Sequence, residues 1–113
     1  MSPSFRTAVL CALNFSQLSG CNATTAALLR PGEPAGGIRI LPTSGNPVTV
    51  VLIWPCDASS PGANRLARNM ALIPGRGHVF DVSAGCWNVA AQSVRSRQQV
   101  MVPPGGVVDY RGP

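Results

Sequence analysis

The stretch Val48-Thr49-Val50-Val51-Leu52-Ile53-Trp54 is the strongest strand signal in the chain and decides the fold. Its residues are mostly β-branched and almost wholly apolar, a composition that favours extended backbone. A strand with no polar face is expected to be covered on both faces, so we expect it at the centre of a sheet. Pro55 follows directly and ends the strand.

Shorter stretches of alternating polar and apolar residues lie on both sides of this run, and turn residues separate them. In Ile73-Pro74-Gly75-Arg76-Gly77, proline presets φ and glycine allows the positive φ that a type II turn requires. A short helix is expected near residues 63–70, with Leu66 and Met70 on one face. Further strands are expected at residues 38–41, 78–82, 86–92, 98–102 and 107–110.

This spacing of short strands is typical of a small antiparallel β-sandwich or barrel, so we predict an all-β domain over residues 37–113. The 113 residues include 12 glycines and 11 prolines, which suits a turn-rich protein better than a helical one. A hydrophobic content of 45% is too high for a disordered chain.

The charge is one-sided, with nine basic residues, four acidic residues and a formal net charge of +5. All nine basic residues are arginines, and they are scattered along the chain. No basic stripe is interleaved with aromatic residues, so we expect a solvated basic surface and no nucleic-acid partner.

The N-terminal segment has the parts of a bacterial export signal. Arg6 precedes an apolar stretch at residues 7–13, which is shorter than the roughly 20 residues that span a bilayer. Leu18-Ser19-Gly20-Cys21 then resembles the lipobox of bacterial lipoproteins. The resemblance implies that residues 1–20 are a signal peptide, and that Cys21 carries a diacylglycerol on Sγ and an acyl chain such as palmitate on its amine.

Asn22 is not the aspartate that retains lipoproteins in the inner membrane of enteric bacteria, which favours the periplasmic face of the outer membrane. Residues 21–36 are small, polar and rich in glycine and proline near their end, so we expect a flexible tether there. Leu28 and Leu29 interrupt it and are candidates to dock on the domain. A second interpretation stays open, in which an unprocessed N-terminal helix packs against neighbouring subunits of a virion or large complex.

The order of segments over residues 38–110 resembles small β-sandwich domains of the bacterial envelope. The resemblance implies a sandwich without an assigned activity, and therefore a structural, protein-interaction or assembly subunit. The segments that carry it are residues 48–54, Asn64-Arg65-Leu66, Pro74-Gly75, residues 80–82 and residues 85–91.

Four cysteines are present, and Cys11 would leave with the signal while Cys21 would carry lipid. Cys56 and Cys86 then remain as a pair suited to an oxidising compartment. If the strand before Cys56 and the strand after Cys86 are antiparallel neighbours, the two Cα atoms come within disulfide range. In a cytosolic protein, two reduced thiols would be expected instead.

No set of residues indicates catalysis. His78 and Asp81 are a nearby histidine and acid, but residues three apart on a strand point to opposite faces. Four scattered acids predict no carboxylate pair, and two cysteines with one histidine do not supply the four ligands of structural zinc. We therefore expect no enzymatic activity, no cofactor and no metal.

The candidate binding residues are Trp54, Arg65 and Arg68, because tryptophan and arginine are enriched at binding surfaces. A binding module could also use Trp87. A tryptophan beside a disulfide is more often part of the core, and we favour a core position for both Trp87 and Trp54.

Overall fold

The computed structural model describes residues 26–112 of the chain. The all-β class is confirmed, with six strands in the described residues. The expected signal peptide, the lipidation site at Cys21 and residues 21–25 of the expected tether lie outside the described residues. The elements in chain order are β1 (Ala35–Leu41), β2 (Val51–Pro55), β3 (His78–Ser83), β4 (Gly85–Ala91), the 3-10 turn η1 (Val94–Ser96), β5 (Gln98–Val102) and β6 (Val107–Arg111).

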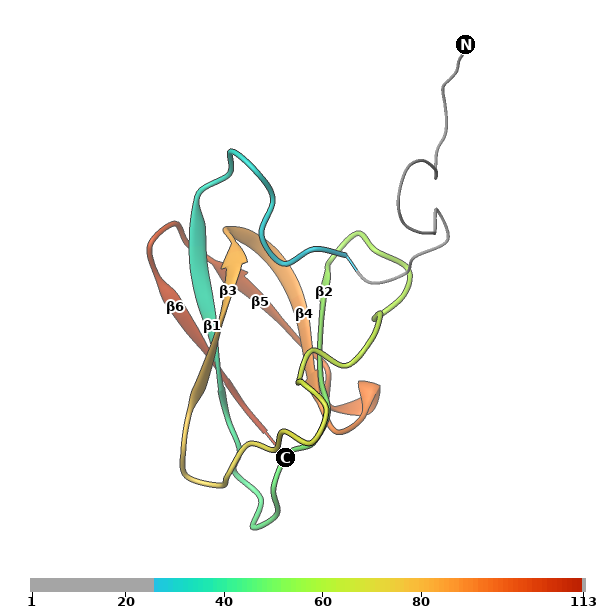
Figure 1. Ribbon diagram of the computed structural model, residues 1–113. Helices are drawn as coiled ribbons and strands as arrows, with labels where there is room; N and C mark the ends of the chain where they lie inside the picture. The colour runs from blue at the N-terminus through green and yellow to red at the C-terminus, as the bar shows by residue number, and fades with distance from the viewer. Residues whose placement is uncertain (1–25, 113) are drawn as a thin grey trace.

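The strands form two three-stranded sheets, ordered β3-β1-β6 and β2-β4-β5 (Figure 1). The second sheet is antiparallel throughout, as expected. In the first sheet β1 is antiparallel to β3 but parallel to β6, which differs from the expected purely antiparallel arrangement. Parallel neighbours need a long crossover connection, and here the chain passes through the other sheet between β1 and β6.

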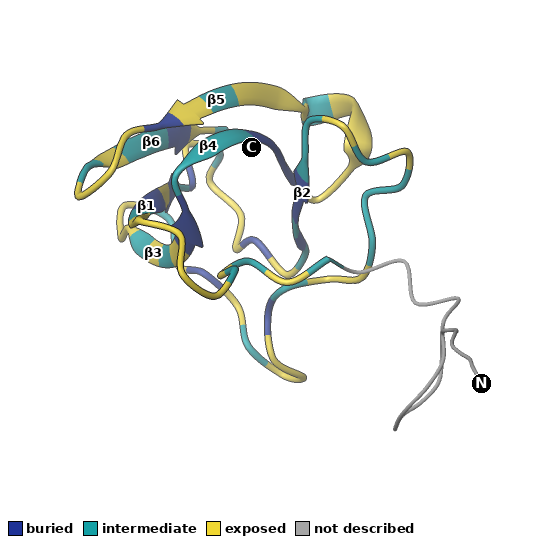
Figure 2. Cartoon of the chain, turned by 90° about the horizontal axis from the view of Figure 1, so that it is seen from above, coloured by how far each residue is buried: buried dark blue, intermediate teal, exposed yellow. Residues whose placement is uncertain are grey.

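Apolar side chains from both sheets contribute to one core. The residues of this core alternate along the strands, as in Ile38 and Ile40 of β1 or Trp87 and Val89 of β4, because successive side chains point to opposite faces. Trp87 and Tyr110 are the largest fully buried side chains. Seen from above, β4 carries a long buried stretch and β5 is mostly exposed (Figure 2).

The regular part of the run at residues 48–54 starts only at Val51. The backbone N–H groups of the two residues just before it donate to a side chain and not to a neighbouring strand. Gln92 Oε1 accepts from the N–H groups of Thr49 at 2.6 Å and Val50 at 2.9 Å. The strand also lies at the edge of its sheet, with β4 at the centre, so the prediction of a central strand was wrong.

The open edge of β2 is covered by the segment that was expected to be helical. The Arg65 N–H donates to the Val51 carbonyl at 2.7 Å, and Asn64 Oδ1 accepts from the Val51 N–H at 2.9 Å. These bonds hold the segment against β2, and residues 63–70 contain no helix, which corrects the prediction. Asn64 and Arg65 thus bond to the backbone N–H and carbonyl of Val51, which an open edge would offer to another chain.

Residues 26–34 lie against the domain, which differs from the flexible tether expected over residues 21–36. The Ser83 N–H donates to the Leu28 carbonyl at 2.8 Å, and the Arg30 N–H donates to Ser83 Oγ at 2.7 Å. Leu28 packs against the core, as its apolar character suggested. β1 then begins at Ala35.

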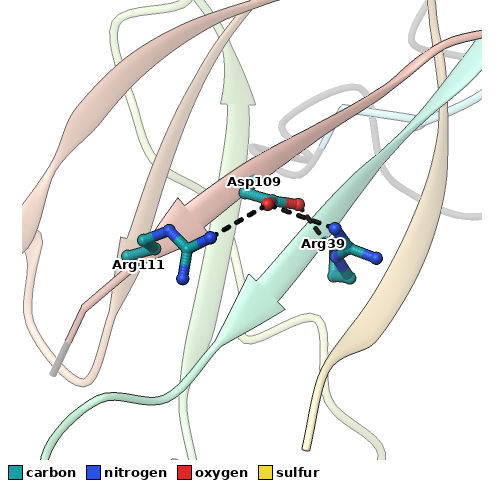
Figure 3. A network of polar contacts seen from close by, with 3 residues as sticks. All are labelled: Arg39, Asp109 and Arg111. Carbon is teal, nitrogen blue, oxygen red and sulfur yellow. Dashed lines mark hydrogen bonds and ion pairs between the residues drawn. The ribbon is translucent and has the colours of Figure 1, made fainter.

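Arg39 of β1 and Asp109 of β6 stand opposite one another in the parallel register (Figure 3). Arg39 Nε donates to Asp109 Oδ1 at 2.8 Å, and Nη2 donates to Oδ2 at 3.1 Å. Arg111 adds a longer contact of 3.5 Å. The hydrogen bond from Arg39 holds the pKa of Asp109 below its ordinary value, and the same pairing raises the pKa of Arg39.

Candidate functional site

A disulfide joins Cys56, just after β2, to Cys86 in β4, which confirms the predicted pair. Their Cα atoms are 5.5 Å apart, within the usual range. The reason is the one expected, since β2 and β4 are antiparallel neighbours and Pro55 stands opposite Trp87. The bond fixes the start of the loop that follows β2.

A hollow of about 630 Å³ adjoins this disulfide. Its volume is within the range of sites that hold small molecules. The loop after β2 forms one wall through Cys56 and Pro61, and η1 with the residue after it forms another through Arg95 and Arg97. Trp54 and Asn88 also line it.

Trp54 and Asn88 stand opposite one another in the register of β2 and β4. The neighbours of both residues along their strands, Ile53 and the pair Trp87 and Val89, belong to the core. Side chains alternate along a strand, so Trp54 and Asn88 point away from the core toward the hollow. They are nonetheless only 7% and 6% exposed.

The polar groups of these two side chains have no partner in the described part of the chain. No described residue forms a hydrogen bond with the Asn88 side-chain amide or with Nε1 of Trp54, whereas Trp87 Nε1 donates to the Ser83 carbonyl at 2.8 Å. Buried polar groups in folded proteins are nearly always hydrogen-bonded. Trp54 and Asn88 form the floor of the hollow. This floor therefore carries buried polar groups that no hydrogen bond within residues 26–112 satisfies.

The wall formed by η1 is fixed by Ser96, the last residue of this turn. Ser96 Oγ lies 2.6 Å from the Ala91 carbonyl oxygen, and the Ser96 carbonyl accepts from the Tyr110 hydroxyl at 2.8 Å. The flanking Arg95 and Arg97 are exposed, and neither forms an ion pair within residues 26–112. Two guanidinium groups thus stand at the hollow without an ion-pair partner among the described acids.

The three candidate binding residues from the sequence occupy different places. Trp54 lies on the floor of the hollow. Arg65 instead covers the edge of β2, where Nη2 donates to the carbonyls of Ile53 at 2.6 Å and Ala26 at 2.7 Å. Burial lowers the pKa of Arg65. Arg68 is exposed and does not line the hollow.

Sequence reasoning missed Asn88, Arg95 and Arg97. A signal for Asn88 was present, because it is the polar residue inside the otherwise apolar strand Trp87–Ala91. Arg95 and Arg97 are only two residues apart in the sequence, but only the fold brings them beside Trp54.

A second hollow of about 520 Å³ touches the same disulfide and is lined by Arg30, Glu33 and Asp57. Its main charges are already paired, since Arg30 Nε donates to Glu33 Oε1 at 2.8 Å. The Arg30 guanidinium also stands 5.3 Å from the centre of the Trp87 ring, within cation–π range. This hollow is therefore a weaker candidate for a charged ligand.

Residues 26–112 hold no cluster of three or more histidine, cysteine or acidic side chains that could bind a metal ion. His78 of the edge strand β3 packs edge-on against Phe80, with ring centroids 4.8 Å apart. No helix within the described part of the chain is long and apolar enough to cross a membrane.

Comparison of the chain with known protein families, with characterised proteins and with solved structures finds no significant match in any of the three.

Proposed function

We propose that this chain is a lipid-anchored protein of the bacterial cell envelope, and that its β domain is a non-enzymatic binding or assembly subunit. The observation that carries the proposal is the disulfide between Cys56 and Cys86. Disulfides persist in oxidising compartments such as the periplasm and are rare in the cytosol. A structural disulfide agrees with export, which is what Leu18-Ser19-Gly20-Cys21 indicates.

We infer that the two sheets form a β-sandwich. Both sheets contribute to the same core, and Tyr110 of one sheet accepts a hydrogen bond from the Ala91 N–H of the other at 3.1 Å. A sandwich exposes loops at its two ends, and such loops carry binding functions in many small β domains. The hollow beside the disulfide lies where one such loop follows β2.

The anchor would hold the domain close to the bilayer. Ala26 is tied to the domain by Arg65, so only five peptide units separate the anchored residue Cys21 from a fixed point. A chain of that length spans at most about 18 Å when fully extended. A partner of this domain would then lie at the membrane surface, in the outer membrane or in an assembly attached to it.

The anchor is tested by fractionation of source cells that express variants in which one cysteine is changed to serine. Cys21→Ser removes the acceptor of the lipid, and we expect it to move the protein from the membrane fraction to the soluble envelope fraction. Cys11→Ser is the matched control, because it changes a cysteine within the segment expected to be cleaved. Membrane association that persists in Cys21→Ser would overturn the proposed anchor.

A further inference from the structure

The strongest unexplained feature of the described chain is the floor of the hollow. Asn88 is 6% exposed, and its side-chain amide has no hydrogen-bond partner among residues 26–112. Trp54 beside it is 7% exposed, and its indole N–H is likewise without a described partner. Removing such groups from water without a new partner is costly, so a ligand that completes them would gain free energy there.

The groups around the hollow select for negative charge. Arg95 and Arg97 add two guanidinium groups, which offer several N–H donors in a planar fork. No aspartate or glutamate lines the hollow. Donors therefore outnumber acceptors, since the Asn88 amide oxygen is the one side-chain acceptor on the floor.

We propose that this hollow binds a small organic acid. One carboxylate pairs with the guanidinium groups of Arg95 and Arg97, because the two oxygens of a carboxylate match the arginine fork. The body of the ligand lies over the floor, where an oxygen accepts from Trp54 Nε1 and a polar group pairs with the Asn88 amide. A volume of about 630 Å³ suits a molecule of metabolite size.

This site does not depend on the lipid anchor, so the test uses the full chain carrying Cys21→Ser. The two tryptophans provide an internal comparison, since the chain has only Trp54 and Trp87. The indole N–H of Trp87 is bonded to the Ser83 carbonyl inside the core. In a nitrogen-15 spectrum, we expect the Trp54 indole signal to shift and saturate as glutarate is added, while the Trp87 signal stays in place. Trp54→Phe assigns the two signals.

Two matched double variants distinguish binding at this site from general attraction of an anion to a basic protein. Arg95→Gln with Arg97→Gln should weaken glutarate binding about tenfold or more, as expected for loss of charged hydrogen bonds. Arg68→Gln with Arg76→Gln removes the same charge from exposed arginines elsewhere and should leave the affinity within about twofold. Asn88→Leu should also weaken binding, and an unchanged Trp87 signal shows that the variant is folded.

The uncharged analogue glutaramide should produce no saturable shift. Equal binding of glutaramide, no saturation by about 50 mM glutarate, or equal loss in the two arginine pairs would overturn the proposal. The last titration uses inorganic phosphate. Tighter binding of phosphate than of glutarate would overturn the proposal that the ligand is a carboxylate.

Discussion

The hydroxyl of Tyr110 donates a hydrogen bond of 2.8 Å to the carbonyl oxygen of Ser96. Tyr110 belongs to β6 in one sheet, and Ser96 ends η1, which follows β4 of the other sheet. The same hydroxyl accepts from the Ala91 N–H at 3.1 Å, and the Tyr110 side chain is fully buried. One buried hydroxyl therefore ties a wall of the hollow to the sheet that contains β6.

Tyr110→Phe keeps the ring and removes both hydrogen bonds. The Ala91 N–H retains Ser96 Oγ as an acceptor at 3.1 Å, so the loss falls mainly on the Ser96 carbonyl. We expect the free energy of unfolding to fall by about 1–2 kcal/mol, measured by urea denaturation. Tyr110→Leu also removes aromatic packing and should cost more. A Tyr110→Phe variant as stable as the wild type would contradict the role given to the hydroxyl.

The disulfide should supply a large share of stability. Cys56 and Cys86 are 30 residues apart, and closing a loop of that length stabilises by about 3–4 kcal/mol through loop-closure entropy. Cys56→Ala with Cys86→Ala should lose this amount in denaturant titration. Adding reductant should lower the wild type to about the same stability and leave the double variant unaffected. A loss below about 1 kcal/mol would show that the bond contributes little.

Gly36 of β1 lies against the turn before β6. A Cβ at this position would meet the carbonyl oxygens of Gly106 and Pro103 at 2.6 Å, and these backbone atoms cannot move away freely. Gly36→Ala should therefore destabilise the protein by about 1–3 kcal/mol or more. Gly45→Ala is the control, because a Cβ there has no atom within 4 Å, and its melting temperature should stay close to that of the wild type. Equal melting temperatures for both variants would argue against this close approach of β1 to the turn.

The pair of Arg39 and Asp109 should make stability depend on pH in the acid range. The pKa of Asp109 is lowered in the folded protein, first by the hydrogen bond from Arg39, so the unfolded chain takes up its proton at higher pH. The contribution of the pair is therefore fully present above the ordinary aspartate pKa of about 4, and it is lost as pH falls through the lower folded value. Asp109→Asn should lack this dependence, which thermal melts across the acid range would measure. The difference in melting temperature between the wild type and Asp109→Asn should shrink as pH falls. A difference that grew would contradict a lowered pKa of Asp109 in the folded protein.

Much of the fold was predictable because local signals in this chain are strong. Alternation at residues 38–41 and 78–82 predicted strands that the structure contains, and the turn at residues 73–77 is confirmed, with Gly75 at φ 84° and the Arg76 N–H donating to the Ile73 carbonyl at 3.1 Å. The disulfide followed from strand ends that meet when neighbours are antiparallel.

The errors arose where tertiary contacts decide the outcome. An apolar run such as residues 48–54 looks central, but Asn64 and Arg65 cover its edge and allow it to lie at the border of its sheet. The same contacts prevent the helix expected there. The candidate site was predicted only through Trp54, because Asn88, Arg95 and Arg97 approach it through strand pairing and η1, which no local pattern reveals.

The most direct test of the central proposal is the intact mass of the protein isolated from the membranes of its source cell. A lipid-anchored envelope protein should have lost residues 1–20 and gained a diacylglycerol and an acyl group at Cys21, with the disulfide between Cys56 and Cys86 intact. A mass equal to that of the full chain of 11.7 kDa without modification would contradict the proposed anchor.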